Sequence, residues 1–154
     1  MNKEFVPYEQ ALELKELGFD ESCFGYFVDG ELRGINLGME ELGGIEPYYQ
    51  RFKCHTLSNH NTNNPNKIIA TAPLYQQAFR WFREKYNLHA EPYTANMGAI
   101  EYCFQIRDLY SEKYVYDNFM GAGSAYGGTF NTPEEAELAC LKKLIELTKE
   151  VSND

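Results

Sequence analysis

"IEYCFQIR", residues 100–107, alternates between apolar and polar side chains over its whole length. A strand directs successive side chains to opposite sides of its sheet, so a two-residue period predicts a half-buried strand. The side chains expected on the buried face are Ile100, Tyr102, Phe104 and Ile106. Those expected on the polar face are Glu101, Cys103, Gln105 and Arg107.

The segments on either side of this strand have their own patterns. After it, "YVYDNF" (114–119) is typical of a neighbouring strand, and "GGTF" (127–130) of the end of another. Before it, a helix is expected within "IIATAPLYQQAFRWFREKYNL" (68–88), with Thr71 as the cap and Asn87 as the terminator. The apolar side of this helix, expected in the core, consists of Leu74, Tyr75, Ala78, Phe79, Trp81, Phe82 and Tyr86.

The N-terminal part begins with a helix predicted over residues 6–17. Gly18 suits the left-handed position that ends a helix, and Phe19 can then fold back on Leu14. Residues 23–36 contain two β-prone runs around Asp29-Gly30, a pair that favours a type I′ hairpin turn. The Asn-rich residues 37–67 follow as a long polar loop, and a connection of this length either is functional or hides a short strand.

In chain order the expected elements are helix, two strands, loop, helix, three strands and helix. This order predicts an α+β fold, in which an antiparallel sheet of about four to five strands carries three packed helices. A chain of 154 residues can bury one core but is too short for two independent ones. We therefore expect a single domain over residues 1–154.

The glycine-rich residues 121–128 are the nearest approach to a phosphate-binding loop. Thr129 stands where a P-loop has lysine, and Tyr126 stands where the dinucleotide pattern has its third glycine. Thr132 and Glu135 instead form the capping-box pattern, in which the first amides of a helix bond to the protein's own side chains. The segment therefore predicts a turn followed by a capped helix.

The composition limits the partners and the compartment. A net charge of −9 disfavours nucleic acid, because phosphates repel an acidic surface. No window has the ~18 apolar residues of a membrane span, and the N-terminus lacks the apolar core of a secretory signal, so we expect a cytoplasmic protein. The widely spaced cysteines, without a C-x-x-C pair, indicate unreactive thiols in a reducing compartment. They are Cys23, Cys54, Cys103 and Cys140.

Two sets of side chains could carry reactive chemistry. Cys103 shares the polar face with Arg107, whose charge would favour a thiolate, but the sequence places no base beside the thiol. A possible metal-ligand set matches no structural zinc spacing. It consists of Cys54, His55, His60 and His89. The sequence therefore predicts no catalytic residue, no metal and no cofactor.

Aromatic side chains are in excess, with 12 Tyr and 10 Phe. Tyrosines in loops and at strand ends can contact a partner at a small cost in entropy, and the arginine of the polar face can join them. The residues expected to bind a partner or a small ligand are Tyr48, Tyr49, Tyr93, Tyr110, Tyr116, Tyr126 and Arg107. Ordinary cross-strand aromatic pairing is the simpler interpretation of the same residues.

Two segments, "APLYQQAFRWFREKYNLHAEPY" (72–93) and "TPEEAELACLKKLIEL" (132–147), carry a resemblance to known proteins. With the Tyr-rich strand region between them, they resemble small uncharacterised phage and prophage proteins of Bacteroidetes. In those proteins a Q-x-x-x-x-W-[LF]-R-[ED]-K helix precedes the strands and a T-x-E-E-A helix closes the domain. The resemblance implies provenance and fold but no reaction, and it leaves out residues 36–66 and the glycine-rich segment.

Together these observations favour a noncatalytic phage or prophage accessory protein that binds a host protein or a small ligand, for example to counter host defence. One alternative is a small hydrolase or transferase with a pocket between the sheet and the Asn-rich loop. A further alternative is a minor virion or assembly component. The sequence does not fix the oligomeric state.

Overall fold

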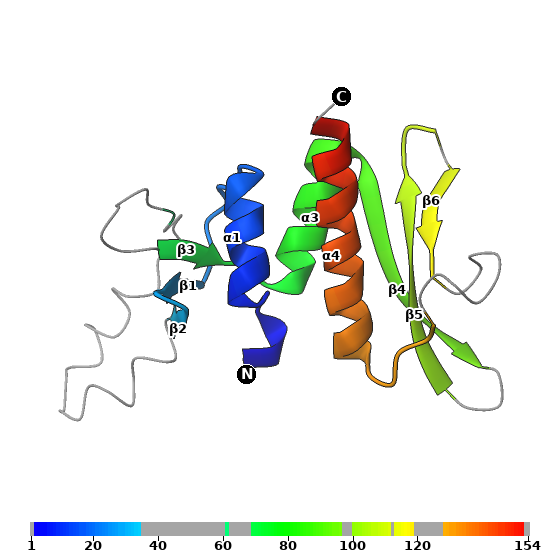
Figure 1. The fold of residues 1–154 in the computed structure, drawn as a ribbon, viewed down its shortest axis with the longest axis horizontal. Coiled ribbons are helices and arrows are strands. Elements are labelled where there is room, and N and C mark those ends of the chain that lie inside the picture. The colour runs from blue at the N-terminus through cyan, green and yellow to red at the C-terminus, as the bar shows by residue number, and fades with distance from the viewer. Residues whose placement is uncertain are drawn as a thin grey trace. The chain divides into compact units, whose positions relative to one another are not determined.

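The computed structural model describes residues 2–34, 61, 69–96, 100–111, 113–118 and 128–152. The chain divides into two compact units, with the boundary between Leu74 and Tyr75. Figure 1 shows the elements of both, and each unit is described by itself. The single domain expected over residues 1–154 stays a prediction. The predicted 37–67 loop lies outside the described residues, apart from Asn61.

The first unit combines one α-helix with a small antiparallel sheet. Its strands are ordered β2-β1-β3, and α1 packs against β3. The elements are η1 (Asn2–Glu4), α1 (Tyr8–Glu16), β1 (Gly25–Val28), β2 (Glu31–Gly34) and β3 (Ile69–Ala72). Helix α1 ends as predicted, because Gly18 has φ 85° and the Phe19 amide donates to the Leu14 carbonyl at 2.9 Å.

The β1–β2 hairpin is also confirmed. Asp29 and Gly30 have φ values of 50° and 90°, which suit a type I′ turn, and Val28 pairs with Glu31 across it. Strand β3 was not predicted, and Thr71 does not cap a helix. Thr71 instead pairs with Tyr26 of β1 and donates its backbone N–H to the Asn61 side-chain oxygen at 2.9 Å. These bonds place Thr71 in a strand, and α3 begins only at Tyr75.

The second unit places two helices on one face of a three-stranded antiparallel sheet. Its strands are ordered β4-β5-β6. Helix α4 packs against β4 and β5, and α3 packs against β4 and α4. The elements are α3 (Tyr75–Tyr86), β4 (Leu88–Asn96), β5 (Ile100–Asp108), β6 (Lys113–Asp117) and α4 (Pro133–Ser152).

The core of this unit lies between the sheet and the helices. Phe104 and Ile106 of β5 are buried, as are Trp81 and Phe82 of α3. The Phe104 ring stacks on the Tyr116 ring of β6, with the ring centroids 5.4 Å apart. Lys143 of α4 lies over that same Tyr116 ring. The side of the sheet that carries Phe104 therefore faces α4. The expected placement of Trp81 and Phe82 in the core is confirmed, and Asn87 ends α3 with φ 58°.

Helix α4 begins at the predicted capping box. The Glu135 amide donates to the Thr132 hydroxyl oxygen at 3.2 Å, and the Glu135 carboxylate accepts from the Asn131 amide at 3.2 Å. The glycine-rich residues 121–127 lie outside the described residues. No helix in the described ranges is long and apolar enough to cross a membrane.

The α+β class and the antiparallel pairing are confirmed, while the described strands form two sheets of three where the sequence predicted one sheet. Strand β4 was not predicted. Pro92 lies in its centre, although proline is excluded from central strands. Proline is tolerated in this strand because β4 lies at the edge of its sheet. The expected strand end before α4 is present as an antiparallel bridge between Phe130 and Tyr102 of β5.

Candidate functional site

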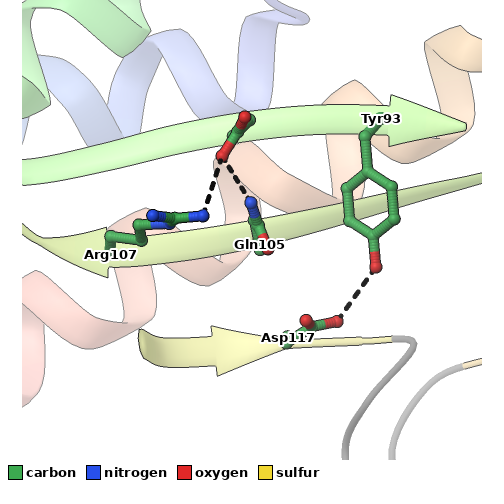
Figure 2. A network of polar contacts seen from close by, with 5 residues as sticks. Tyr93, Gln105, Arg107 and Asp117 are labelled. Atoms are coloured by element: carbon green, nitrogen blue, oxygen red, sulfur yellow. Dashed lines mark hydrogen bonds and ion pairs between the residues drawn. The ribbon is translucent and has the colours of Figure 1, made fainter. Parts of the chain in front are cut away.

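Polar side chains gather on the face of the β4-β5-β6 sheet opposite to α3 and α4. The strand register sets Glu91 directly across from Gln105, and Gln105 across from Asp117 on β6. Directly paired residues lie on the same side of a sheet, so three strands contribute to one surface. We call this surface the polar face, and it consists of Glu91, Tyr93, Gln105, Arg107 and Asp117. Figure 2 shows it from the side away from the helices.

One half of the polar face is organised by the carboxylate of Glu91. It accepts a hydrogen bond from the side-chain amide of Gln105 and pairs with the Arg107 guanidinium at 3.8 Å (Figure 2). The Arg107 and Glu91 side chains are 41% and 46% exposed. An ion pair that is this long and this exposed to solvent contributes about 1 kcal/mol or less to stability. Its more evident effect is to hold a planar, multidentate cation in place on an accessible surface.

The other half spans the full width of the sheet. The Tyr93 hydroxyl of β4 donates to the Asp117 carboxylate of β6 at 3.2 Å, so the tyrosine side chain crosses β5 (Figure 2). Tyr93 pairs directly with Cys103, which is fully buried. The phenol is thereby held in one orientation, which reduces the rotamer entropy that it would lose on binding.

Cys103 occupies the predicted side of β5, but its chemistry differs from the expectation. Burial raises the pKa of the Cys103 thiol, and the nearby carboxylates of Glu101 and Asp117 raise this pKa further. The hypothesis that Arg107 would favour a thiolate is therefore wrong, because Arg107 is paired with Glu91 while two carboxylates lie near the sulfur. A neutral thiol is a poor nucleophile.

Asn118 fixes the position of the polar face but was not recognised in the sequence. It is buried and follows Asp117 directly. Its side-chain oxygen accepts from the Phe104 amide at 2.6 Å, and its side-chain amide donates to the Gly128 carbonyl at 3.0 Å. One side chain thus bonds both to β5 and to the segment that leads into α4. A single asparagine after a strand gives no sequence signal of this role.

The structure brings together only some of the residues expected to bind a partner. Tyr93 and Arg107 lie on the polar face. Tyr116 lies on the opposite side of the sheet, against Phe104 and Lys143. Tyr110 lies in the turn between β5 and β6 and is 91% exposed. Three others, Tyr48, Tyr49 and Tyr126, lie outside the described residues.

Sequence reasoning identified the β5 part of the polar face but missed the rest. Gln105 and Arg107 were assigned to the correct side of their strand. Glu91 was missed together with β4, and Asp117 was not assigned to a side of its strand. Residues 88–96 do not alternate cleanly between apolar and polar side chains, so the sequence carries no clear signal for β4.

The candidate metal ligands Cys54, His55 and His60 lie outside the described residues, and His89 lies in β4 opposite Arg107. Within the described ranges, no three His, Cys, Asp or Glu side chains are placed to hold a metal ion. No family model, curated protein or solved structure matches the chain.

Proposed function

We propose that the protein is a noncatalytic binding protein that uses the polar face of its second sheet to bind a host protein. The observation that carries this proposal is the hydrogen-bonded arrangement of Glu91, Gln105 and Arg107, which is partly exposed on a supported sheet. The resemblance to phage and prophage proteins supports a role in the cytoplasm of a phage-infected or lysogenic bacterium, where interference with host defence is one use of such binding.

The chemistry of the polar face suits recognition of another protein. Arg107 can exchange its long ion pair with Glu91 for a bidentate bond to a partner carboxylate. Tyr93 offers an oriented aromatic ring, and Gln105 offers an amide that can donate and accept. These groups are already ordered by one another, so binding would fix few additional rotamers.

The same face favours binding over a hydrolase or transferase. The thiol beside Tyr93 is buried, and its raised pKa keeps it protonated at neutral pH. The carboxylates of Glu91 and Asp117 each accept a hydrogen bond from a neighbouring side chain. Such pairing positions side chains but leaves no nucleophile and base side by side, which is the arrangement that covalent catalysis needs.

The charge of the chain indicates the kind of partner. At −9 the protein attracts basic surfaces and is repelled by nucleic acid and by anionic lipid. We therefore expect the partner to be a host protein with a basic surface, which also carries a carboxylate for Arg107. A small ligand is the alternative outcome of the test below.

Native mass spectrometry of the chain purified from host cells tests this proposal, with two arginine variants compared. Arg107→Ala removes the cation of the polar face. Arg80→Ala is a matched control, because Arg80 lies on α3, is 48% exposed and pairs with Glu84 at 3.9 Å. We expect wild type and Arg80→Ala to retain the same host protein, and Arg107→Ala to retain at least tenfold less. Equal retention by both variants would contradict the proposal.

A retained small molecule instead of a protein would change the partner class, and turnover of that molecule would favour the enzyme alternative. Detection of the chain in purified phage particles would favour the virion alternative. Each outcome gives a distinct mass or a distinct sample, so the alternatives can be told apart.

A further inference from the structure

The turn between β5 and β6 is held rigidly by one carboxylate. Oδ1 of Asp108 accepts from the Tyr110 amide at 2.8 Å, and Oδ2 accepts from the Ser111 hydroxyl at 3.0 Å. The Leu109 amide donates to the Asn87 carbonyl at 2.8 Å, which ties the start of the turn to the end of α3. The hydrogen bonds lower the pKa of Asp108, so the turn is bonded to a carboxylate that is ionised at neutral pH.

This rigid turn presents two large side chains to solvent. Tyr110 is 91% exposed and Leu109 is about half exposed, and we call the pair the apolar tip. Isolated exposed apolar residues are common on protein surfaces. The apolar tip differs from them because the backbone amides of Leu109 and Tyr110 are both hydrogen-bonded, to the Asn87 carbonyl and to Asp108. A pre-ordered aromatic side chain beside an aliphatic one is the composition typical of a binding anchor.

The apolar tip is continuous with the polar face. Arg107 is the last polar-face residue of β5, Asp108 follows it, and the tip comes next along the same backbone. A protein that covers Arg107 would therefore meet Leu109 and Tyr110 at the edge of its footprint. Anchors of this kind act by filling a pocket from which water is excluded.

We propose that Tyr110 and Leu109 insert into an apolar pocket with a basic rim on the host protein that binds the polar face, an inference that rests on the proposed function. The basic rim follows from the charge of −9 that the whole chain carries, because Asp108 at the base of the tip lies across from Lys113 and adds no net charge there. The same charges argue against an anionic membrane as the surface that receives the tip. The phenol hydroxyl requires a hydrogen-bond partner in the pocket, as buried tyrosines do.

Photo-crosslinking in host-cell lysate tests this inference. The full chain carries the photoreactive p-benzoyl-phenylalanine in place of Tyr110, and a second preparation carries it in place of Ile100, which is 68% exposed on the same strand at its other end. Unlabelled competitors are wild type and the variants Tyr110→Ser, Ile100→Ser and Arg107→Ala. The measured quantity is the yield of each adduct as competitor and salt are increased.

We expect position 110, but not position 100, to form an adduct with a host protein. Wild type and Ile100→Ser should compete for it equally, Tyr110→Ser should compete at least tenfold less, and the yield should fall with added salt because the rim is charged. Asp108→Ala, which releases the turn but keeps the tip, should compete less than wild type and better than Tyr110→Ser.

Several outcomes would overturn the inference. Full competition by Tyr110→Ser, together with weak competition by Arg107→Ala, would show that the apolar tip does not contribute to binding. The proposed function of the polar face would then still stand. Full competition by both variants would overturn the inference and the proposed function together. Absence of an adduct at position 110 would overturn the inference alone, and the retention measured for Arg107→Ala would then decide the proposed function. An adduct between two copies of the chain would identify a dimer contact. Tyr110-dependent sedimentation with vesicles of phosphatidylcholine and phosphatidylglycerol would identify a lipid surface.

Discussion

The two faces of the β4-β5-β6 sheet are built from the same strands but have opposite roles. Phe104 and Ile106 point toward α4 and are buried, whereas Gln105 and Arg107 lie between and beyond them in sequence and point away. On the buried face, the Phe104 ring stacks on the rings of Tyr116 and Phe130, with centroids 5.4 and 6.2 Å apart. On the polar face, hydrogen bonds and a long ion pair connect partly exposed groups. Stability therefore depends on the first face, and the second can be used for binding.

The largest effect should come from the buried face. Phe104→Ala removes a ring that stacks on Tyr116 and Phe130, and we expect a loss of about 3–5 kcal/mol in the free energy of unfolding. Urea denaturation followed by circular dichroism measures this loss. Gln105→Ala, the next residue, is the control and should lose about 1 kcal/mol or less. Equal losses at the two positions would abolish the distinction between the faces.

A smaller loss should follow from removing the side chain that connects the sheet to the segment before α4. Asn118→Ala leaves the Phe104 amide and the Gly128 carbonyl without their side-chain partner, which should cost about 2–3 kcal/mol. The exposed Asn96 at the end of β4 provides the control, since Asn96→Ala removes the same chemical group at the surface. If the two variants unfold at the same urea concentration, Asn118 has no structural role.

The buried side of this unit should also make its stability depend on pH, because Tyr75 lies in the helix layer that covers the buried face. Burial and the Glu137 carboxylate raise the pKa of Tyr75 to about 12. A folded-state pKa above the unfolded value of about 10 gives stability that is complete below pH 10 and lost as the pH rises to about 12. The loss should be about 2 kcal/mol.

Urea denaturation between pH 9 and 12 measures this loss. The variant Tyr75→Phe is the control and should lose about 2 kcal/mol less than wild type over this range. The loss that remains in the variant is expected from the buried thiols of Cys103 and Cys140, because burial raises their pKa as well. A wild-type protein whose stability changes no more steeply than that of Tyr75→Phe would show that Tyr75 ionises as freely as in an unfolded chain.

The sequence predicted well those features of the buried face and of the helix ends that depend on local backbone geometry. The alternation in residues 100–107 correctly predicted that Phe104 and Ile106 are buried and that Gln105 and Arg107 are not, because that period depends only on local backbone geometry. It was wrong about burial at two positions, since Ile100 is 68% exposed at the strand end and Cys103 is buried. The helix ends at Gly18 and Asn87 were likewise local, since each needs a positive φ. Strand β3 was missed because its four residues precede a helical pattern and are ordered by pairing with β1.

The composition of the polar face depends on the long-range pairing of β4 and β6 with β5. Pro92 lies within β4, and the bond from the Leu109 amide to the Asn87 carbonyl shows which backbone groups of the strand face β5. By alternation, those of residues 89, 91, 93 and 95 face β5, and the Pro92 nitrogen points to the outer edge, where no donor is needed. Glu91 and Asp117 reach Arg107 and Tyr93 only through this register, which a single sequence does not reveal.

The smallest expected change in stability gives the most direct test of the division between the two faces. Arg107→Ala should change the free energy of unfolding by no more than about 0.5–1 kcal/mol, since the ion pair that it removes is long and exposed. Measured on the same preparation, its retention of the host protein should fall at least tenfold. A stability loss as large as that of Phe104→Ala, or an unchanged retention, would contradict the assignment of the polar face to binding.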